Sequence, residues 1–250
     1  MTKANSTKKQ KQSAPTASTN SRPELRIDWA THEAAKYAVE NWHYSKCMPA
    51  FKVVKIGVWE NAKFIGVVLF SMGAAPQAHC PYGIEKRDIC ELTRVALNSH
   101  ETPVTRIVSI ALRFLKRQSP GIRLVVSYAD PEQGHDGGIY KGGNWVYVGH
   151  TGLCEQFEYV ATGERVHTKT IKTGRRGHAT KLKAQGIIRS VKVWKHKYLM
   201  PLDDEMKKQI KPLRKPYPKR VRSVDSDTSA IHAEMGGANP TRTLSIPPEE

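Results

Sequence analysis

Apolar residues recur at helical spacing between Val104 and Leu115, and this is the clearest pattern in the chain. Thr102 can cap the predicted helix, with Pro103 at its first position. The segment 122–128 follows, and its β-branched residues predict a buried strand. Another apolar run, at 89–97, precedes the helix. Strand, helix and strand in this order predict a parallel pair joined by a right-handed crossover.

Other hydrophobic runs fill the rest of the ordered body. A helix that Thr31 can cap is predicted from the spacing of Ala35, Ala38, Val39 and Trp42. The remaining predicted elements are a short glycine-flanked segment carrying Tyr140 and strands at 25–27, 51–59, 64–70, 145–148, 156–160 and 165–171. The coarse order is β-α-β-β-β-α-β-α-β-β. It predicts an α/β (α+β) domain, whose mixed, mostly antiparallel sheet contains one parallel strand pair and is flanked by helices.

The charge balance adds a polyanionic partner to this picture. The chain carries 40 Lys and Arg against 23 Asp and Glu, a net charge of +17. Extended basic surface of this size usually binds nucleic acid. We expect residues 1–23 to form a disordered basic arm and 24–202 the catalytic domain. Residues 203–224 are then a basic C-terminal extension, and 225–250 a disordered tail.

The location of the protein follows from what the sequence lacks. No apolar run is long enough to span a bilayer, so we expect no membrane partner and no signal peptide. The four cysteines have no paired spacing, which favours free thiols in the cytoplasm over a disulfide scaffold: Cys47, Cys80, Cys90 and Cys154.

Polar residues gather where the predicted strand 122–128 ends, namely Ser127, Asp130, His135 and Tyr140. In α/β sheets, ligands bind at the carboxyl ends of strands. Asp130 suits either a turn or helix cap, or a general base or metal ligand. Tyr140 is either a core tyrosine or a catalytic group, and the glycines around it would let a ligand approach the backbone closely.

An aromatic cluster follows the first predicted helix. Trp42, His43 and Tyr44 are adjacent, and Lys46 comes two residues later. Such a cluster can stack on a nucleic-acid base, or it can simply pack in the core. His43, Tyr44 and Asp130 also suit a metal such as iron. The spacing alone does not decide between these interpretations.

The basic segment 165–192 contains no carboxylate, which argues against an ordinary solvated face of mixed charge. A cation that neutralises a phosphate releases counterions, so we expect binding that falls steeply with salt. Residues 207–222 are interpreted as an extended basic arm. The predicted DNA contacts are Trp42, Lys46, Arg175, Arg176, Lys181 and Lys183.

The element order resembles that of the GNAT-type acyl-CoA transferases. In that fold, the acyl-CoA diphosphate sits on amides between a strand and the following helix, here 97–105. The resemblance implies acetyl-CoA or a related acyl-CoA as cofactor, with Arg94, Ser99, Thr102 and Ser127 as its contacts. The usual glycine-containing loop is absent, and Asn98-Ser99-His100-Glu101-Thr102-Pro103 stands in its place.

Four motifs resemble the Mom DNA-modification proteins of Mu-like bacteriophages, over about residues 25–220. They are Trp42-His43-Tyr44-Ser45-Lys46, Glu91-Leu92-Thr93-Arg94, Ser127-Tyr128-Ala129-Asp130 with Tyr140, and Asn144-Trp145 with Tyr147-Val148-Gly149. The resemblance implies modification of adenine N6 to a carbamoylmethyl adduct in host cytoplasm, so that phage DNA escapes restriction. It also implies Asp130, Tyr140, His43 and Tyr44 as catalytic residues.

Double-stranded DNA is therefore the expected partner, and a homodimer is left open. Adenine N6 is out of reach inside a duplex, so the base would have to be extruded. Two other functions remain alternatives: a GNAT-type acetyltransferase of RNA or protein amines, and a noncatalytic nucleic-acid-binding module. A zinc deaminase is disfavoured because its H-x-E and P-C-x-x-C motifs are missing.

Overall fold

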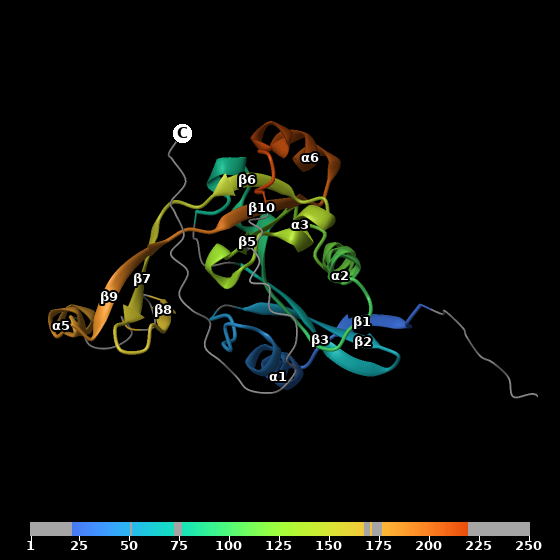
Figure 1. Cartoon of the computed structure of the whole chain (residues 1–250). Coiled ribbons are helices and arrows are strands. Elements are labelled where there is room, and N and C mark those ends of the chain that lie inside the picture. Colours follow the sequence, from blue (N-terminus) through green and yellow to red (C-terminus); the bar gives the residue numbers. More distant parts are fainter. Residues whose placement is uncertain (1–21, 51, 73–76, 168–170, 172–176, 220–250) are drawn as a thin grey trace, which may run out of the picture.

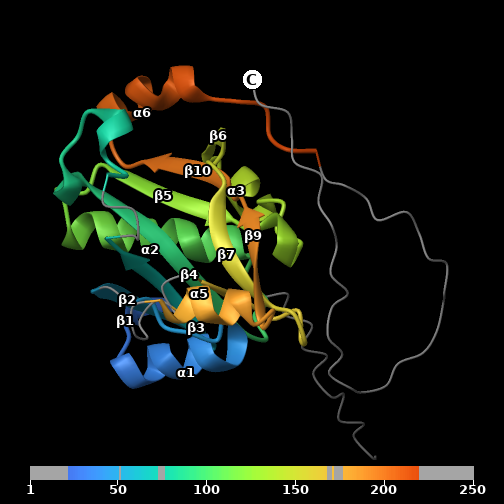
Figure 2. The ribbon, with the colours of Figure 1, turned by 90° about the vertical axis from the view of Figure 1, so that its left-hand side faces the viewer.

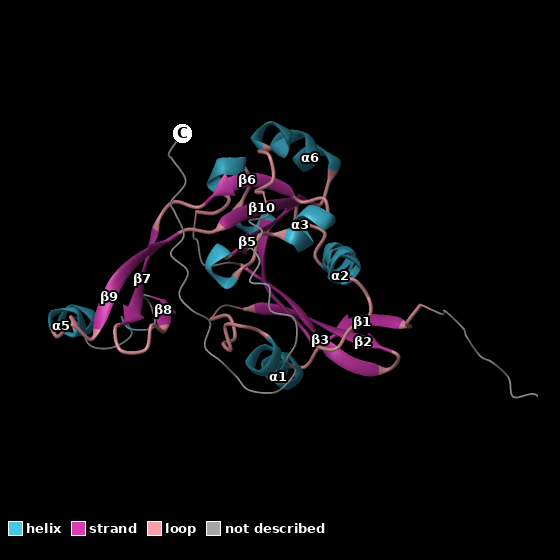
Figure 3. Cartoon of the chain, in the orientation of Figure 1, coloured by secondary structure: helices cyan, strands magenta, loops and turns pink. Residues whose placement is uncertain are grey.

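The computed structural model describes residues 22–50, 52–72, 77–167, 171 and 177–219. Within them, a seven-stranded sheet runs in the order β1-β2-β3-β4-β5-β10-β6, and a three-stranded sheet in the order β8-β7-β9 (Figure 1; Figure 3). The strands of the large sheet are β1 (Leu25–Trp29), β2 (Val53–Glu60), β3 (Lys63–Ser71), β4 (Ile89–Leu97), β5 (Leu124–Ala129), β6 (Val146–His150) and β10 (His196–Pro201). The predicted fold class, mostly antiparallel with one parallel pair, is confirmed.

The parallel pair is short, and this decides where a cavity can form. β4 and β5 pair only from Ile89 to Glu91, opposite Leu124 to Val126. Beyond this point β4 continues to Leu97 and β5 to Ala129 without pairing to each other. The two strands therefore diverge toward their carboxyl ends, where the loops that follow them can surround a ligand.

Helices cover both faces of the sheet (Figure 2). α1 (His32–Trp42) packs its alanines against Val67 and Leu69 of β3. α2 (Val104–Gln118) packs against Val68 and Phe70, which point to the opposite face because strand side chains alternate. α3 (Gly138–Gly142) joins α2 through Tyr140 in the same core. α6 (Asp204–Ile210) lies over the far part of the α1 face, where its Met206 is fully buried.

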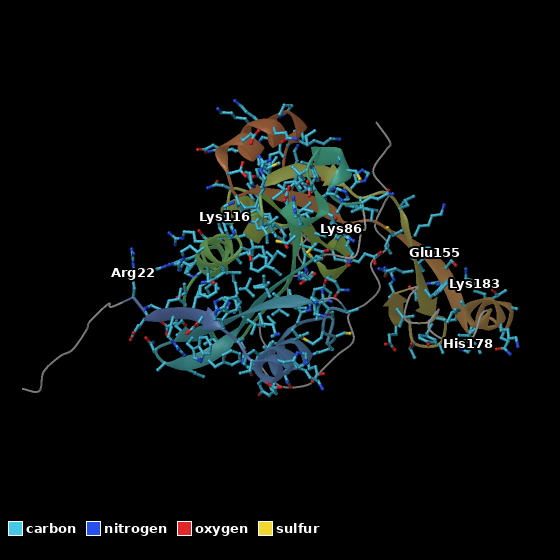
Figure 4. All side chains as sticks on the ribbon, turned by 180° about the vertical axis from the view of Figure 1, so that it is seen from behind. Arg22, Lys86, Lys116, Glu155, His178 and Lys183 are labelled. Carbon is cyan, nitrogen blue, oxygen red and sulfur yellow. The ribbon has the colours of Figure 1, made fainter. Side chains whose placement is uncertain are left out.

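The second sheet projects from this body, and we call it the arm, residues 154–193. It consists of β7 (Cys154–Tyr159), β8 (Arg165–His167), α5 (His178–Ala184) and β9 (Ile188–Val193). Glu155, His178 and Lys183 mark its far side in Figure 4. The predicted hairpin at 156–160 and 165–171 is present as β7 and β8, but residues 168–170 lie outside the described residues.

The last strand of the body was missed by the sequence analysis. β10 runs between β5 and β6 and pairs antiparallel with both. Its residues lie between the segments 165–192 and 203–224, which had been interpreted mainly as basic surface. The segment 203–219 also differs from the expected extended arm. It begins with α6, and farther on the amide of Lys215 donates to Tyr147 O. Residues 1–21 of the predicted arm 1–23, residues 220–224 of the predicted extension 203–224 and the whole predicted tail 225–250 lie outside the described residues.

No helix among the described residues has the length and apolarity needed to cross a bilayer.

Candidate active site

A cavity of about 540 Å³ lies where β4 and β5 diverge. Its walls come from the end of α1, the exposed half of β4, the loop before α2 and the loop between β5 and α3. The polar and aromatic side chains on it include Trp42, His43, Tyr44, Arg94, His135, Asp136 and Tyr140. The fold therefore brings together three of the four sequence motifs.

His43 ends α1 and lies buried in the cavity wall. Its Nδ1 accepts a hydrogen bond from the Ser45 amide at 3.1 Å, which leaves the ring proton of a neutral imidazole on Nε2. Burial, the Arg94 charge and His135 together lower the pKa of His43 from 6.5 to about 3. The imidazole is therefore neutral at pH 7, and Nε2–H is its remaining hydrogen-bond donor.

Tyr44 stands at the mouth of the cavity with its ring about half exposed. Its ring centroid lies 4.3 Å from that of His43 and 5.3 Å from that of His135. Trp42, in contrast, is half-buried and packs edge-on against Tyr37 and beside Phe64. The expected aromatic cluster is thus divided: Tyr44 contacts His43 at a tilt and His135 edge-on at the cavity, while Trp42 mainly supports α1.

Tyr140 reaches the cavity, but its proton is already engaged. The Ser127 hydroxyl donates to Leu92 O at 2.9 Å, so the 2.8 Å contact between Ser127 Oγ and Tyr140 Oη must have the tyrosine as donor. Burial raises the pKa of Tyr140 to about 12, against the opposing effect of the Ser127 hydrogen bond. The phenol is therefore neutral, and its oxygen is free to accept from a ligand. Ser127, predicted as a cofactor contact, is fully buried in this chain of hydrogen bonds.

Asp130 does not line the cavity, in contrast to the expectation. Its carboxylate accepts from the Glu132 amide, capping the 3₁₀ turn Pro131–Gln133, and lies 3.2 Å from Lys195 Nζ. The turn-cap interpretation of this residue is the one the structure shows. Asp136, six residues later, is the carboxylate on the lining. Its position depends on Gly137, where a Cβ would come within 2.0 Å of the Tyr198 hydroxyl.

The turn before α2 does not fit the diphosphate of coenzyme A. The amides of Glu101 and Thr102 each donate to the carboxylate of Glu60, at 2.8 Å. Burial alone would raise the pKa of Glu60, but hydrogen bonds from Thr102 and Glu101 outweigh it and lower the pKa. An anion from β2 thus occupies the donors that this turn would offer to phosphate.

The predicted cofactor contacts on this turn change accordingly. Thr102 is buried and donates to Glu60, and α2 begins after Pro103 rather than after Thr102. Ser99 is exposed, and its hydroxyl donates to the Asn98 side chain. An acyl-CoA cofactor therefore stays a prediction, without a diphosphate site at 97–105.

Iron finds no support in the geometry. Among the described residues, no group of three or more His, Cys, Asp or Glu side chains could hold a metal ion. His43 also accepts at Nδ1 from Ser45, so it cannot at the same time present a bare Nε2 to a metal as a neutral ring. Asp130 faces Lys195 instead.

The predicted DNA contacts fall into three groups. Lys181 and Lys183 lie exposed on α5 of the arm, and Lys46 lies exposed after α1, with its ammonium donating to Asn41 O. Arg175 and Arg176 lie outside the described residues. Trp42 is the half-buried support of α1 described above.

Acids from β7 reduce the positive charge of the arm, which the basic segment by itself did not reveal. Lys183 lies 3.0 Å from Glu155, while Arg165 and Arg189 both bind the buried Glu158. Arg165 also binds Glu132, which lies in the turn beside Asp130. The arm is thus tied by an ion-pair network to the loop that lines the cavity.

Two features, one on the cavity lining and one at the turn before α2, have no signal in the sequence. Asp136 is one of several acids in a loop, and Glu60 looks like an ordinary hairpin residue. Only the pairing of β2 with β3 and of β3 with β4 brings Glu60 to the end of β4.

Comparisons with known proteins identify the family of the chain. The Mom protein family matches residues 24–219. The methylcarbamoylase mom of Escherichia phage Mu is 25% identical over 158 residues, which cover 62% of this chain and 64% of the relative, so the match spans less than two thirds of the relative's length.

Among solved structures, the chain is similar to a candidate acetyltransferase of Acinetobacter baylyi (TM-score 0.42, 12% identity, 80% of this chain and 100% of that one). It is also similar to the N-acyl amino acid synthase FeeM of uncultured soil microbes (TM-score 0.39, 13% identity, 77% and 96%). At this distance we draw no conclusion about activity from either.

Proposed function

The chain belongs to the Mom protein family, and from this premise we propose that it is a phage DNA-modification enzyme that converts adenine to N6-(carbamoylmethyl)adenine. The modification would protect phage DNA from restriction endonucleases inside the host cell. The observation that carries the proposal is the cavity at the diverging ends of β4 and β5, with the half-exposed Tyr44 ring between His43 and His135 on its lining.

The cavity supports this proposal by its size and by the groups on its walls. A volume of about 540 Å³ suffices for an extruded base together with a small donor. Tyr44 and His135 offer ring faces on which a base can stack. The Nε2–H of His43 suits a ring nitrogen of adenine, and the oxygen of Tyr140 suits the N6 amine as an acceptor.

The proton of the N6 amine needs an acceptor as the new bond forms, since the amine lone pair is delocalised into the ring. Two acids follow β5. Asp136 lines the cavity, whereas Asp130 caps a turn and lies beside Lys195. We therefore assign proton acceptance to Asp136 within this proposal, in place of Asp130.

The charge of the protein supports DNA as the acceptor. The net charge is +17, and cations such as Lys181 lie exposed on the arm, which connects through Arg165 to the loop beside the cavity. An acetyltransferase of RNA or protein amines is less well supported, because the amides of the turn that would hold the coenzyme diphosphate donate to the carboxylate of Glu60 in β2.

The decisive experiment is mass spectrometry of nucleosides from the DNA of bacteria that express the protein. We expect a carbamoylmethyl adduct of deoxyadenosine and resistance of the same DNA to restriction enzymes. Asp136→Asn should abolish the adduct while keeping salt-sensitive DNA binding, and Asp130→Asn is the matched control that should retain it.

Unmodified adenine in cells with active, folded protein would refute the proposal. If Asp130→Asn, and not Asp136→Asn, abolished the adduct, the assignment of the proton acceptor would be reversed. If the protein bound DNA but formed no product under any condition, the result would instead favour a noncatalytic binding module.

A further inference from the structure

Arg94 presents an unused hydrogen-bonding edge in the cavity. Its Nη1 donates to Thr93 O at 2.7 Å. Its Nε is buried and has no hydrogen-bond partner among the described residues, and no acid of these residues lies within ion-pair distance of its guanidinium. A buried donor without a partner destabilises the empty site, so a ligand that satisfies it gains affinity.

The position of this guanidinium is fixed by a bulge in β4. The pairing of β3 with β4 shifts register, so that Leu69 lies opposite Arg94 and Phe70 opposite Leu92. Thr93 is the extra residue, and its hydroxyl donates to Leu69 O. Bulges re-aim side chains beside functional sites. With Nη1 held by the backbone, Nε and Nη2 form the edge that remains for a planar, two-oxygen partner.

The formal charges on the described lining cancel: Arg94 is its one permanently charged cation, Asp136 contributes a carboxylate, and His43 is neutral. The lining therefore offers one guanidinium, which suits a single carboxylate. A phosphate or diphosphate would need further cations. The other candidate anion site, the turn before α2, already contains the Glu60 carboxylate.

We propose that Arg94 binds the carboxylate of a small molecule inside the cavity, and that no coenzyme diphosphate is held on α2. The inference rests on the proposed function of the cavity, and it names the class of a small ligand that binds there beside the base: a compact monocarboxylate. Arg94 is its binding residue, and the Nε–Nη2 edge of the guanidinium is the part that binds.

The test uses the full-length protein without DNA and ¹³C-labelled acetate as the probe, with binding measured by NMR line broadening. We expect acetate to bind the wild type and to lose affinity by about tenfold or more in Arg94→Gln, because a charge-assisted bidentate bond is lost. Arg94→Lys keeps the charge without the planar fork and should also bind weakly. Arg113→Gln, which changes an exposed arginine of α2, is the matched control and should bind acetate as the wild type does.

A second measurement needs no variant and compares coenzyme A with pantetheine, which lacks the diphosphate. We expect the two to bind the wild type equally. Coenzyme A binding about tenfold tighter than pantetheine would overturn the inference, and so would inorganic phosphate displacing acetate at equal concentration. Equal acetate binding by Arg94→Gln and the wild type would also overturn it.

Failure of this inference is distinguishable from failure of the proposed function. Acetate binding is read without DNA or product, whereas the adenine adduct is read in DNA whatever the donor. If the Arg94→Gln variant kept acetate binding but lost DNA binding, we would conclude that Arg94 contacts a DNA phosphate instead.

Discussion

The body and the arm each bury one glutamate, and they satisfy its charge in different ways. Glu60 of the body is 6% exposed and accepts from two backbone amides, within a domain whose cores contain many fully buried side chains. Glu158 of the arm is 3% exposed and is bound by Arg165 and Arg189. Backbone donors are fixed and cannot be screened, whereas arginine partners can be lost to solvent or salt.

The apolar cores of the body and the arm differ in size. Around Phe157 and Ile188 the arm has a small cluster, while the body has three larger clusters on the two faces of its sheet. A small core leaves less stability to lose before a region opens locally. The comparison teaches that the body is held by extensive packed cores, while the arm, with its exposed cations, is held by a small core and ion pairs and should open locally before the body does.

The largest expected effect comes from emptying the core of the arm. Phe157→Ala should cost about 3–5 kcal/mol and unfold the arm while the body stays folded. Hydrogen exchange with mass spectrometry should then show loss of protection in β7 and β9 only. Leu199→Ala, in β10, is the matched control and should lower the stability of the whole body by about 2–5 kcal/mol. Equal loss of protection in β5 and β7 upon Phe157→Ala would mean that the two regions unfold as one unit.

The second-largest effect should come from removing Glu60, the buried carboxylate of the body. Glu60→Ala strips two amides of their acceptor and should cost about 2 kcal/mol or more in the free energy of unfolding. Glu40→Ala on the surface of α1 is the control and should change it by less than about 0.5 kcal/mol. Urea unfolding measures both.

The charge of Glu60 should also make the stability of the body depend on pH in acid. The pKa of Glu60 is lowered below its ordinary value of 4.5, so the unfolded chain takes up its proton first. Its contribution is present above pH 4.5 and is lost as the pH falls through the lower folded pKa. Glu60→Gln should therefore unfold less steeply below pH 4.5. Identical acid slopes for both proteins would argue against the charged, amide-bound carboxylate.

His43 should give a smaller effect, which tests how well the cavity wall excludes water. Its pKa of about 3 lies below the ordinary 6.5, so the unfolded state binds a proton first between these values. The body should lose about 2 kcal/mol between pH 8 and pH 5 from this residue. His43→Gln should lack this dependence, and NMR titration of the wild-type ring should show no protonation above pH 5. A ring that titrates near pH 6.5 would contradict a closed wall.

The smallest effect on stability should come from the surface of the arm. Lys183→Ala removes an exposed pair with Glu155 and should change the free energy of unfolding by less than about 0.5 kcal/mol. If the arm contacts DNA phosphates, the slope of log affinity against log salt should fall by about one. Lys36→Ala on α1 is the control with no expected change in slope. Equal slopes for the two variants would move the DNA contact away from the arm.

Local patterns were sufficient for most elements of the body. The helical spacing of 104–115, the hairpin of β2 and β3 and the parallel partners β4 and β5 were all predicted, because each follows from periodicity within a few residues. β10 was missed, since its short run at 196–201 follows a basic segment and resembles surface until β5 and β6 are placed on both sides of it. The expected site residues met with mixed outcomes. His43, Tyr44, Arg94 and Tyr140 line the cavity, and Asp130 does not.

The sequence by itself determined that this is a basic α/β domain of the Mom type and predicted a site at the end of β5, because hydrophobic period, charge and short motifs are properties of the chain alone. Only the tertiary structure decided which anion sits at α2 and which acid faces the cavity. It also decided how much of the arm's charge is neutralised. These depend on partners such as Glu60, Glu158 and Lys195, which approach from distant strands, and no local pattern records a contact made across a sheet.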